Sequence, residues 1–214
     1  ESFWSLLSRA PGLIKTKMRT VLLVVSFAFQ AASSLVLPFA KAGREKIKSD
    51  LLQLALRTER GLTASPAEND EVIRLFEQLE KLNPTRKPLK SGLVDGVWSL
   101  EYTTSESILG KGGFPRVGPI LQEIDTENLR GENSEIVSYF GVSVPRKVTA
   151  ELNPRNDQLT DVKFKRFSVG PIGFNAPDSF RGFLDITYVD DNLRLTRGDK
   201  GNIFVLTRFD SGKK

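Results

Sequence analysis

The sequence of 214 residues contains no cysteine and no histidine. The missing cysteine excludes disulfide bonds, thiol catalysis and cysteine-based zinc clusters, and the missing histidine removes the imidazole that many acid–base mechanisms use. The obvious carboxylates are Asp185, Asp190, Asp191 and Asp199, and the last three sit in turn sequences, where aspartate commonly caps backbone amides. We therefore expect no catalytic residues, no metal site and no enzymatic activity.

The sequence also lacks any strong concentration of charge of one sign. It has 31 Lys and Arg against 26 Asp and Glu, a formal net charge of +5, and the basic residues are spread along the chain. No aromatic-basic ribonucleoprotein motif and no recognition-helix pattern is present. We expect no nucleic-acid partner, whereas a basic surface suits anionic membrane lipids or an acidic protein equally well.

Charge is missing altogether from residues 21–40, and basic residues flank this run on both sides. A helix of this length is about 30 Å long, close to the thickness of a bilayer's hydrocarbon core. A signal peptide with a small-residue cleavage site and a peripheral, protein-bound segment are the alternatives. We expect a retained membrane-spanning helix within an arm of residues 1–43. The residues expected to contact lipid or a partner protein are Phe3, Trp4, Val21, Leu22, Val25, Phe29, Leu35 and Phe39.

Two segments after this arm carry apolar residues at helical spacing. The first covers residues 44–59 and ends near Gly61, a suitable stop. The second opens with the capping box Ser65-Pro66-Ala67-Glu68, which places proline at the first helical position, and it ends before Pro84. We expect two amphipathic helices, an antiparallel pair that packs against the rest of the protein, with a linker completing the region 44–92.

The apolar pattern then changes to a period of two, which is typical of half-buried strands. In residues 94–105 the turn Asp95-Gly96 precedes an alternation that places Trp98, Leu100 and Tyr102 on one face. Seven further strand candidates follow, at residues 117–125, 135–142, 147–152, 159–169, 182–189, 192–197 and 202–209. Eight mostly antiparallel strands can close a barrel that holds one small apolar ligand. The sequence therefore predicts a mainly β (α+β) protein, with a barrel over residues 93–209 and a short tail of residues 210–214.

Phenylalanine outnumbers tyrosine by 14 to 3, which suits an apolar barrel interior. A lipid cavity and a filled core both fit this composition. For a cavity we expect the lining to include Phe140, Phe164, Phe167, Phe183, Ile186 and Phe204. The last two strands carry three arginines that are candidates to stack over Trp98 and close the barrel base: Arg194, Arg197 and Arg208. We expect Arg208 to do so, because it shares a strand face with Phe204 and Leu206.

Several motifs together resemble the plastid lipid-associated protein family, the fibrillins of plastoglobules and thylakoids. They are Arg60-Gly61-Leu62, Leu82-Asn83-Pro84-Thr85, the stretch 95–105 and the stretch 194–206, which bracket residues 44–209 in the family's order. The resemblance implies a lipocalin-like barrel, a plastid location, no enzymatic activity and no required cofactor. It also implies association with carotenoids, quinones or other prenyl lipids. The residues that it carries over as a fold signature are Gly96, Trp98, Arg197, Gly198, Asp199 and Gly201.

Two functions follow from these observations. The first is a thylakoid- or plastoglobule-associated protein that binds or shields an apolar isoprenoid lipid and supports photosynthetic membranes, with thylakoid membrane lipids as partners. The alternative is a structural subunit or peripheral stabiliser of a photosystem or antenna complex, anchored by residues 1–43. The apolar arm departs from the usual pattern of the family and favours a thylakoid-anchored member.

Overall fold

The computed structural model describes residues 41–110 and 113–210. The chain divides into two compact units after Lys46. The second unit, which begins at Ile47, contains a pair of helices and a sheet. The predicted membrane span, residues 21–40, lies outside the described residues, as do all the arm contacts predicted from Phe3 to Phe39. Among the helices of residues 41–110 and 113–210, none combines the length and the apolar character needed to cross a membrane.

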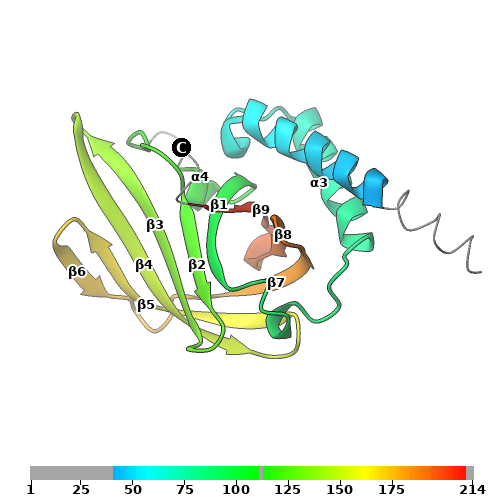
Figure 1. The fold of residues 1–214 in the computed structure, drawn as a ribbon. Helices are drawn as coiled ribbons and strands as arrows, with labels where there is room; N and C mark the ends of the chain where they lie inside the picture. The colour runs from blue at the N-terminus through cyan, green and yellow to red at the C-terminus, as the bar shows by residue number, and fades with distance from the viewer. Residues whose placement is uncertain (1–40, 111–112, 211–214) are drawn as a thin grey trace, which may run out of the picture. The chain divides into compact units, whose positions relative to one another are not determined.

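The described residues form nine antiparallel strands in one sheet (Figure 1). The strands are β1 (Gly96–Thr103), β2 (Leu121–Asp125), β3 (Arg130–Tyr139), β4 (Val142–Pro154), β5 (Leu159–Val169), β6 (Ile172–Asn175), β7 (Arg181–Val189), β8 (Leu193–Arg197) and β9 (Ile203–Arg208). Each strand of the series β1 to β5 pairs with the next, β5 pairs with β7, and β9 returns to pair with β1. Eight strands thus close an up-and-down barrel, the arrangement found in lipocalins.

The ninth strand, β6, is the addition that the sequence did not predict. It pairs with the last residues of β5, whereas β7 pairs with the first residues of β5, so β6 extends the barrel wall at one end only. The predicted strand at residues 135–142 was wrong in its extent, because the chain turns at Phe140 and Gly141. Both residues have positive φ, +50° and +87°, and β4 begins directly after them.

Helices precede the barrel as predicted. The first described helix covers residues 41–57, the short 3-10 turn η1 (Glu59–Gly61) follows, and α3 (Pro66–Lys81) is the second long helix. The predicted capping box at Ser65 is present, since its hydroxyl accepts from the Glu68 amide while the Glu68 carboxylate accepts from the Ser65 amide. Three short elements complete the fold: η2 (Pro88–Lys90), α4 (Glu106–Leu109) and η3 (Asp199–Gly201).

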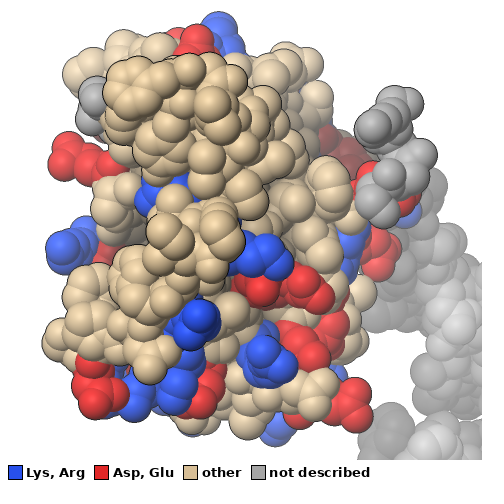
Figure 2. Space-filling view, turned by 90° about the vertical axis from the view of Figure 1, so that its left-hand side faces the viewer, with Lys and Arg blue, Asp and Glu red and all other residues tan. Residues whose placement is uncertain are grey.

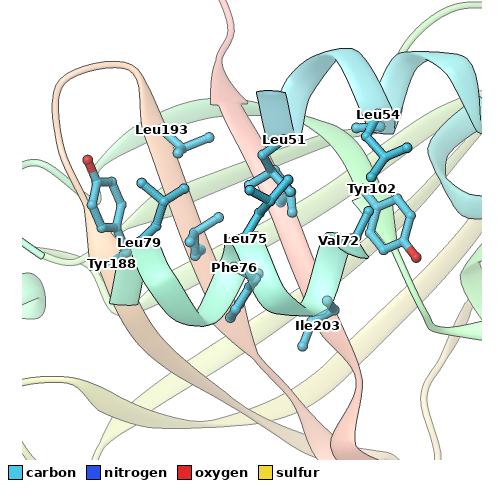
Figure 3. Packing of buried hydrophobic residues seen from close by; sticks show 13 residues of the cluster. Leu51, Leu54, Val72, Leu75, Phe76, Leu79, Tyr102, Tyr188, Leu193 and Ile203 are labelled. Atoms are coloured by element: carbon cyan, nitrogen blue, oxygen red, sulfur yellow. The ribbon is translucent and has the colours of Figure 1, made fainter. Parts of the chain in front are cut away.

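Both long helices bury their apolar stripes on the outside of the barrel (Figure 3). Leu75 and Phe76 of α3 share one buried cluster with Leu51 of the first helix and with Leu193 of β8. Full burial of such a side chain contributes about 1.5–3 kcal/mol relative to exposure. Because the helices cover β7, β8, β9 and the end of β1, these strands are buried on both faces, which explains why all four first residues of β8 are inaccessible.

A β-bulge changes the face on which one predicted core residue lies. Trp98 and Leu100 point into the barrel, but the pairing of β1 with β9 shifts between Leu100 and Tyr102. Tyr102 therefore lies on the outer face, within the cluster formed by the helices, and its hydroxyl donates to the side chain of Asn69 on α3. The prediction that these three residues share one face is wrong for Tyr102. The bulge inserts one extra residue into β1, so the side chains after it point to the opposite face from the one that strict alternation predicts.

Ionic contacts also hold the helices on the barrel. Lys48 binds Asp190 at 2.8 Å, and both side chains are largely buried. Burial alone would raise the pKa of Asp190, but hydrogen bonds from Lys48, Tyr188 and two backbone amides outweigh it and hold this pKa below its ordinary value. Asp190 therefore remains ionised at neutral pH and caps the turn between β7 and β8.

Candidate functional site

One end of the barrel is closed by Trp98. Its side chain is fully buried, and its indole N–H donates to the Val94 carbonyl at 2.8 Å. Gly96, at φ +104°, opens β1 two residues before Trp98, and a Cβ at this position would lie 3.0 Å from a guanidinium nitrogen of Arg208. The tight backbone at Gly96 thus leaves room for the arginine that packs beside the indole.

Two arginines lie over the Trp98 ring. The predicted stacking of Arg208 is confirmed, with its Cζ 3.9 Å from the ring centroid, and its Nη atoms donate to the carbonyls of Asp95 and Leu93. Arg194 of β8 is the second, with its Cζ 4.9 Å from the same centroid. Arg208 ties β9 to the segment before β1, a structural role.

The interior above this base is lined by apolar side chains. Ile186 is fully buried in the interior cluster, and the partly buried Phe164 and Phe204 pack against that cluster. Phe167 continues the lining, since its ring stacks with that of Phe164 at a centroid separation of 6.4 Å. These phenylalanines point inward, toward the end of the barrel opposite Trp98, and each keeps part of its surface accessible.

Two of the predicted lining residues lie elsewhere. Phe140 is 94% exposed at the tip of the β3–β4 hairpin, because the chain turns there instead of continuing as a strand. Phe183 is partly buried on the outer face of β7, opposite to Leu184 and Ile186, because successive strand residues point to opposite faces. The interior assignment of Phe140 and Phe183 is therefore wrong.

Exposed apolar side chains gather at the end of the barrel opposite Trp98. The ring centroids of Phe114 and Phe140 lie 5.4 Å apart, and those of Phe167 and Phe174 lie 5.6 Å apart. Figure 2 shows this side of the molecule, where uncharged residues cover the upper part of the face and most charged residues gather below. We call this surface the rim. Its most exposed members are Phe114, Phe140, Val142, Ile172, Phe174 and Phe180.

A separate polar hollow of about 530 Å³ lies on the outer wall, beside the end of α3. Arg197 crosses it, donating to both carboxylate oxygens of Glu80 at 2.7 Å, and its Cζ lies 5.2 Å from the Phe76 ring centroid. The side chain of Asn83 bonds to backbone atoms of Thr85, Thr187 and Val189. These contacts tie α3 and its linker to β7 and β8, so the motif residues here act in packing.

The remaining signature residues form the turn between β8 and β9. Gly198 lies so close to Phe204 that a Cβ would come within 2.7 Å of the ring, and Gly201 has φ +74°. The Asp199 carboxylate lies against Gly182 of β7, where a Cβ would meet it at 2.9 Å. The turn thus packs against the Phe204 ring at the end of the barrel opposite Trp98.

Sequence reasoning missed the polar groups inside the barrel. Arg194 and Thr196 face inward, whereas their apolar neighbours Leu193 and Leu195 pack against the helices. Gln122 of β2 accepts a hydrogen bond from Arg194 and donates to Asn133 at 3.0 Å. The strict alternation of β8 was a usable signal, but it does not say which face is covered by helices.

Nothing in this arrangement resembles a catalytic centre. In the parts of the chain that the structure describes, no three acidic side chains gather as metal ligands would. The site is instead a barrel base closed by Trp98, with the buried Arg194, an apolar lining and an exposed apolar rim. Such an arrangement can enclose an apolar molecule.

Comparison with known proteins gives the family. Residues 45–207 match the PAP/fibrillin family. Plastid-lipid-associated protein 5 of Arabidopsis thaliana is 38% identical over 78% of this chain and 71% of its own length. The chromoplast-specific carotenoid-associated protein of Cucumis sativus is 27% identical over 76% of this chain and 67% of its own.

Among solved structures, bovine odorant-binding protein in complex with undecanal is 12% identical, with a TM-score of 0.35 over 56% of this chain and 74% of its own. The family match covers most of the chain and includes the Gly96 and Trp98 motif, the Asn83 linker and the β8–β9 turn. The chain therefore belongs to the plastid lipid-associated protein family, the PAP/fibrillins.

Proposed function

We propose that this protein holds one apolar isoprenoid lipid, such as a carotenoid or a quinone, in the open half of its barrel. As a fibrillin it is a non-enzymatic, lipid-associated protein. The observation that carries the proposal is the row of inward-facing, partly accessible phenylalanines, Phe164, Phe167 and Phe204, above a base that Trp98 closes. Eight-stranded barrels have an interior of the size that suits one small ligand.

The relatives support a plastid setting for this binding. The two named above carry the words chloroplastic and chromoplastic, and one is named for its association with carotenoid. We place the protein at plastid membranes, either the thylakoid or the plastoglobule, where it would support photosynthetic membranes. The rim fits this setting, because exposed aromatic and aliphatic side chains favour contact with a lipid surface.

The same rim also favours a second candidate, a peripheral stabiliser of a membrane complex such as a photosystem or antenna. In that case the exposed Phe114 and Phe140 would dock on a protein, and residues 1–43 would anchor the chain. A large exposed apolar patch marks lipid and protein contacts alike. The two candidates differ in whether the barrel holds a lipid. The first candidate requires a bound lipid, and the second does not.

Two phenylalanines on neighbouring strands provide a matched test. Phe164→Glu places a carboxylate in the apolar lining, whereas Phe183→Glu places the same group on the outer wall. An unpaired charge buried against a lipid costs several kcal/mol, so we expect the first variant to weaken binding of decylplastoquinone at least about tenfold. We expect the second variant to change it less than about threefold. The measurement is quenching of Trp98 emission by this quinone in the full chain, with Trp4, the second tryptophan, replaced by phenylalanine.

Circular dichroism and thermal unfolding show whether each variant is folded, and Phe164→Ala serves if the glutamate variant is not. Equal losses of binding in the Phe164 and Phe183 variants would place the ligand outside the barrel. Unchanged binding in a folded Phe164→Glu protein would contradict the proposal outright.

A further inference from the structure

Arg194 is an unusual residue for the interior of a lipid barrel. It lies on the inward face of β8 and is 0% exposed, between the base formed by Trp98 and the open half above it. Leu193 and Leu195, its neighbours on the strand, point the other way into the cluster under the helices. Because these leucines and the helices occupy the outer face of β8, Arg194 lies on the face that points into the barrel.

Its hydrogen bonds are incomplete. One Nη atom donates to Gln122, but Nε and the other Nη are buried and have no acceptor among the described residues. The hydroxyl of Thr196, two residues along the same face, is also buried without a partner. Unpaired donors are costly when they are removed from water, so three such atoms on one inward strand face indicate a missing partner.

Its charge is equally uncompensated. Arg208, the other arginine at Trp98, bonds to backbone carbonyls and lies near the negative charges of Asp191 and Asp95. Arg194 has no ion pair in the described part of the chain. Burial, and secondarily the charge of Arg208, lowers the pKa of Arg194 to about 9, so the side chain is still charged at neutral pH. The missing partner should therefore be an acceptor, and a negative one completes the site best.

We propose that Arg194 and Thr196 form the polar end of the lipid site and bind the carboxylate of a ligand whose apolar chain extends toward Phe164. This inference rests on the proposed function, and it adds the class of head group. A carboxylate accepts from several donors at once and neutralises the buried guanidinium. A hydrocarbon such as a carotene offers neither, and an alcohol offers an acceptor without charge.

Retinoic acid and retinol provide a matched pair of probes, because they share one isoprenoid chain and differ at its end. Their binding to the full chain can be followed by energy transfer from Trp98, in a background in which Trp4, the second tryptophan, is replaced by phenylalanine. We expect retinoic acid to bind at least about tenfold more tightly than retinol, since hydrogen bonds to charged groups are the stronger ones.

The variants distinguish the contribution of the ligand's head group from that of its apolar chain. Arg194→Met should weaken retinoic acid at least about tenfold and leave retinol within about threefold, which removes the preference. Thr196→Val should weaken retinoic acid severalfold without a change in charge. Arg74→Met, which removes an exposed arginine from α3, is the control for net charge and should change neither probe.

Each result of these binding measurements supports or overturns the head-group proposal. Failure of both probes to bind the unaltered barrel would overturn the head-group proposal together with the proposed function. Equal affinity of the two probes, or an equal loss of both in Arg194→Met, would overturn the head-group proposal alone and indicate that ordered water fills the polar end. If Arg194→Met does not fold, the preference of the unaltered protein and of Thr196→Val still gives the answer.

Discussion

Replacement of Trp98 by alanine is expected to lower the free energy of unfolding by about 3–5 kcal/mol, the range for removal of a buried large aromatic side chain. The indole is fully buried at the closed end of the barrel, where it contacts Arg194 and Arg208 and donates to the Val94 carbonyl. Its removal leaves a cavity and also leaves two cations without the ring that they face. Urea unfolding followed by far-ultraviolet circular dichroism measures the change.

The control for this experiment is Trp98→Phe, which keeps an aromatic ring but loses the hydrogen bond to Val94. We expect a smaller loss, about 1–2 kcal/mol, because most of the volume and the cation–π contact remain. A loss below about 1 kcal/mol in Trp98→Ala would mean that the indole does not close the barrel.

The second large effect is expected at Gly61, in the turn between the two helices. This glycine has φ +98°, and a Cβ there would lie 2.7 Å from the carbonyl oxygen of Thr103 and 3.1 Å from the Tyr102 ring. Gly61→Ala therefore adds backbone strain to a collision with β1, and we expect a loss of about 2–4 kcal/mol in unfolding free energy. Thermal or urea unfolding of the full chain gives the value.

Gly92→Ala provides the matched control. Gly92 also has positive φ, +71°, but nothing lies within 4 Å of the position that its Cβ would take. Only the backbone strain remains, so about 1–2 kcal/mol is expected. Equal losses at the two positions would show that the close approach of Gly61 to β1 does not matter for holding the helices.

The elements that the sequence predicted correctly are those with strong local signals. The capping box at Ser65 and the apolar stripe after it depend on neighbours within a few residues, and they predicted α3 directly. The strand at residues 159–169 matches β5 because alternation and turn residues define both its ends. Arg208 was found from its register relative to Phe204 and Leu206, which a regular strand preserves.

The elements that it missed depend on information that is not local. The bulge at Tyr102 inverts a face without any change in composition, so the alternation of residues 98–102 was misleading. At Phe140 the apolar run continues through a turn, and Gly141 was the weak signal that the strand ends there. The four-residue strand β6 at the sheet edge is too short for its periodicity to be read.

The residues of the candidate site likewise include some that the sequence predicts and one that it does not. Phe164, Phe167, Phe204 and Ile186 were predictable as interior residues, because apolar side chains of a barrel strand usually point inward. Arg194 was not, because the usual rule assigns the polar residues of β8 to the outside. The rule fails here since the helices supply an apolar environment on the outer face, where Leu193 and Leu195 are buried.

The central claim is that the open half of the barrel holds a lipid. The most direct test is mass spectrometry of the organic extract from the full chain, purified natively from plastid membranes without a lipid-exchanging detergent. The account predicts close to one apolar lipid per chain, and its loss from the folded Phe164→Glu protein but not from Phe183→Glu. A folded, native protein that yields no lipid would contradict the account and would favour a docking role for the rim.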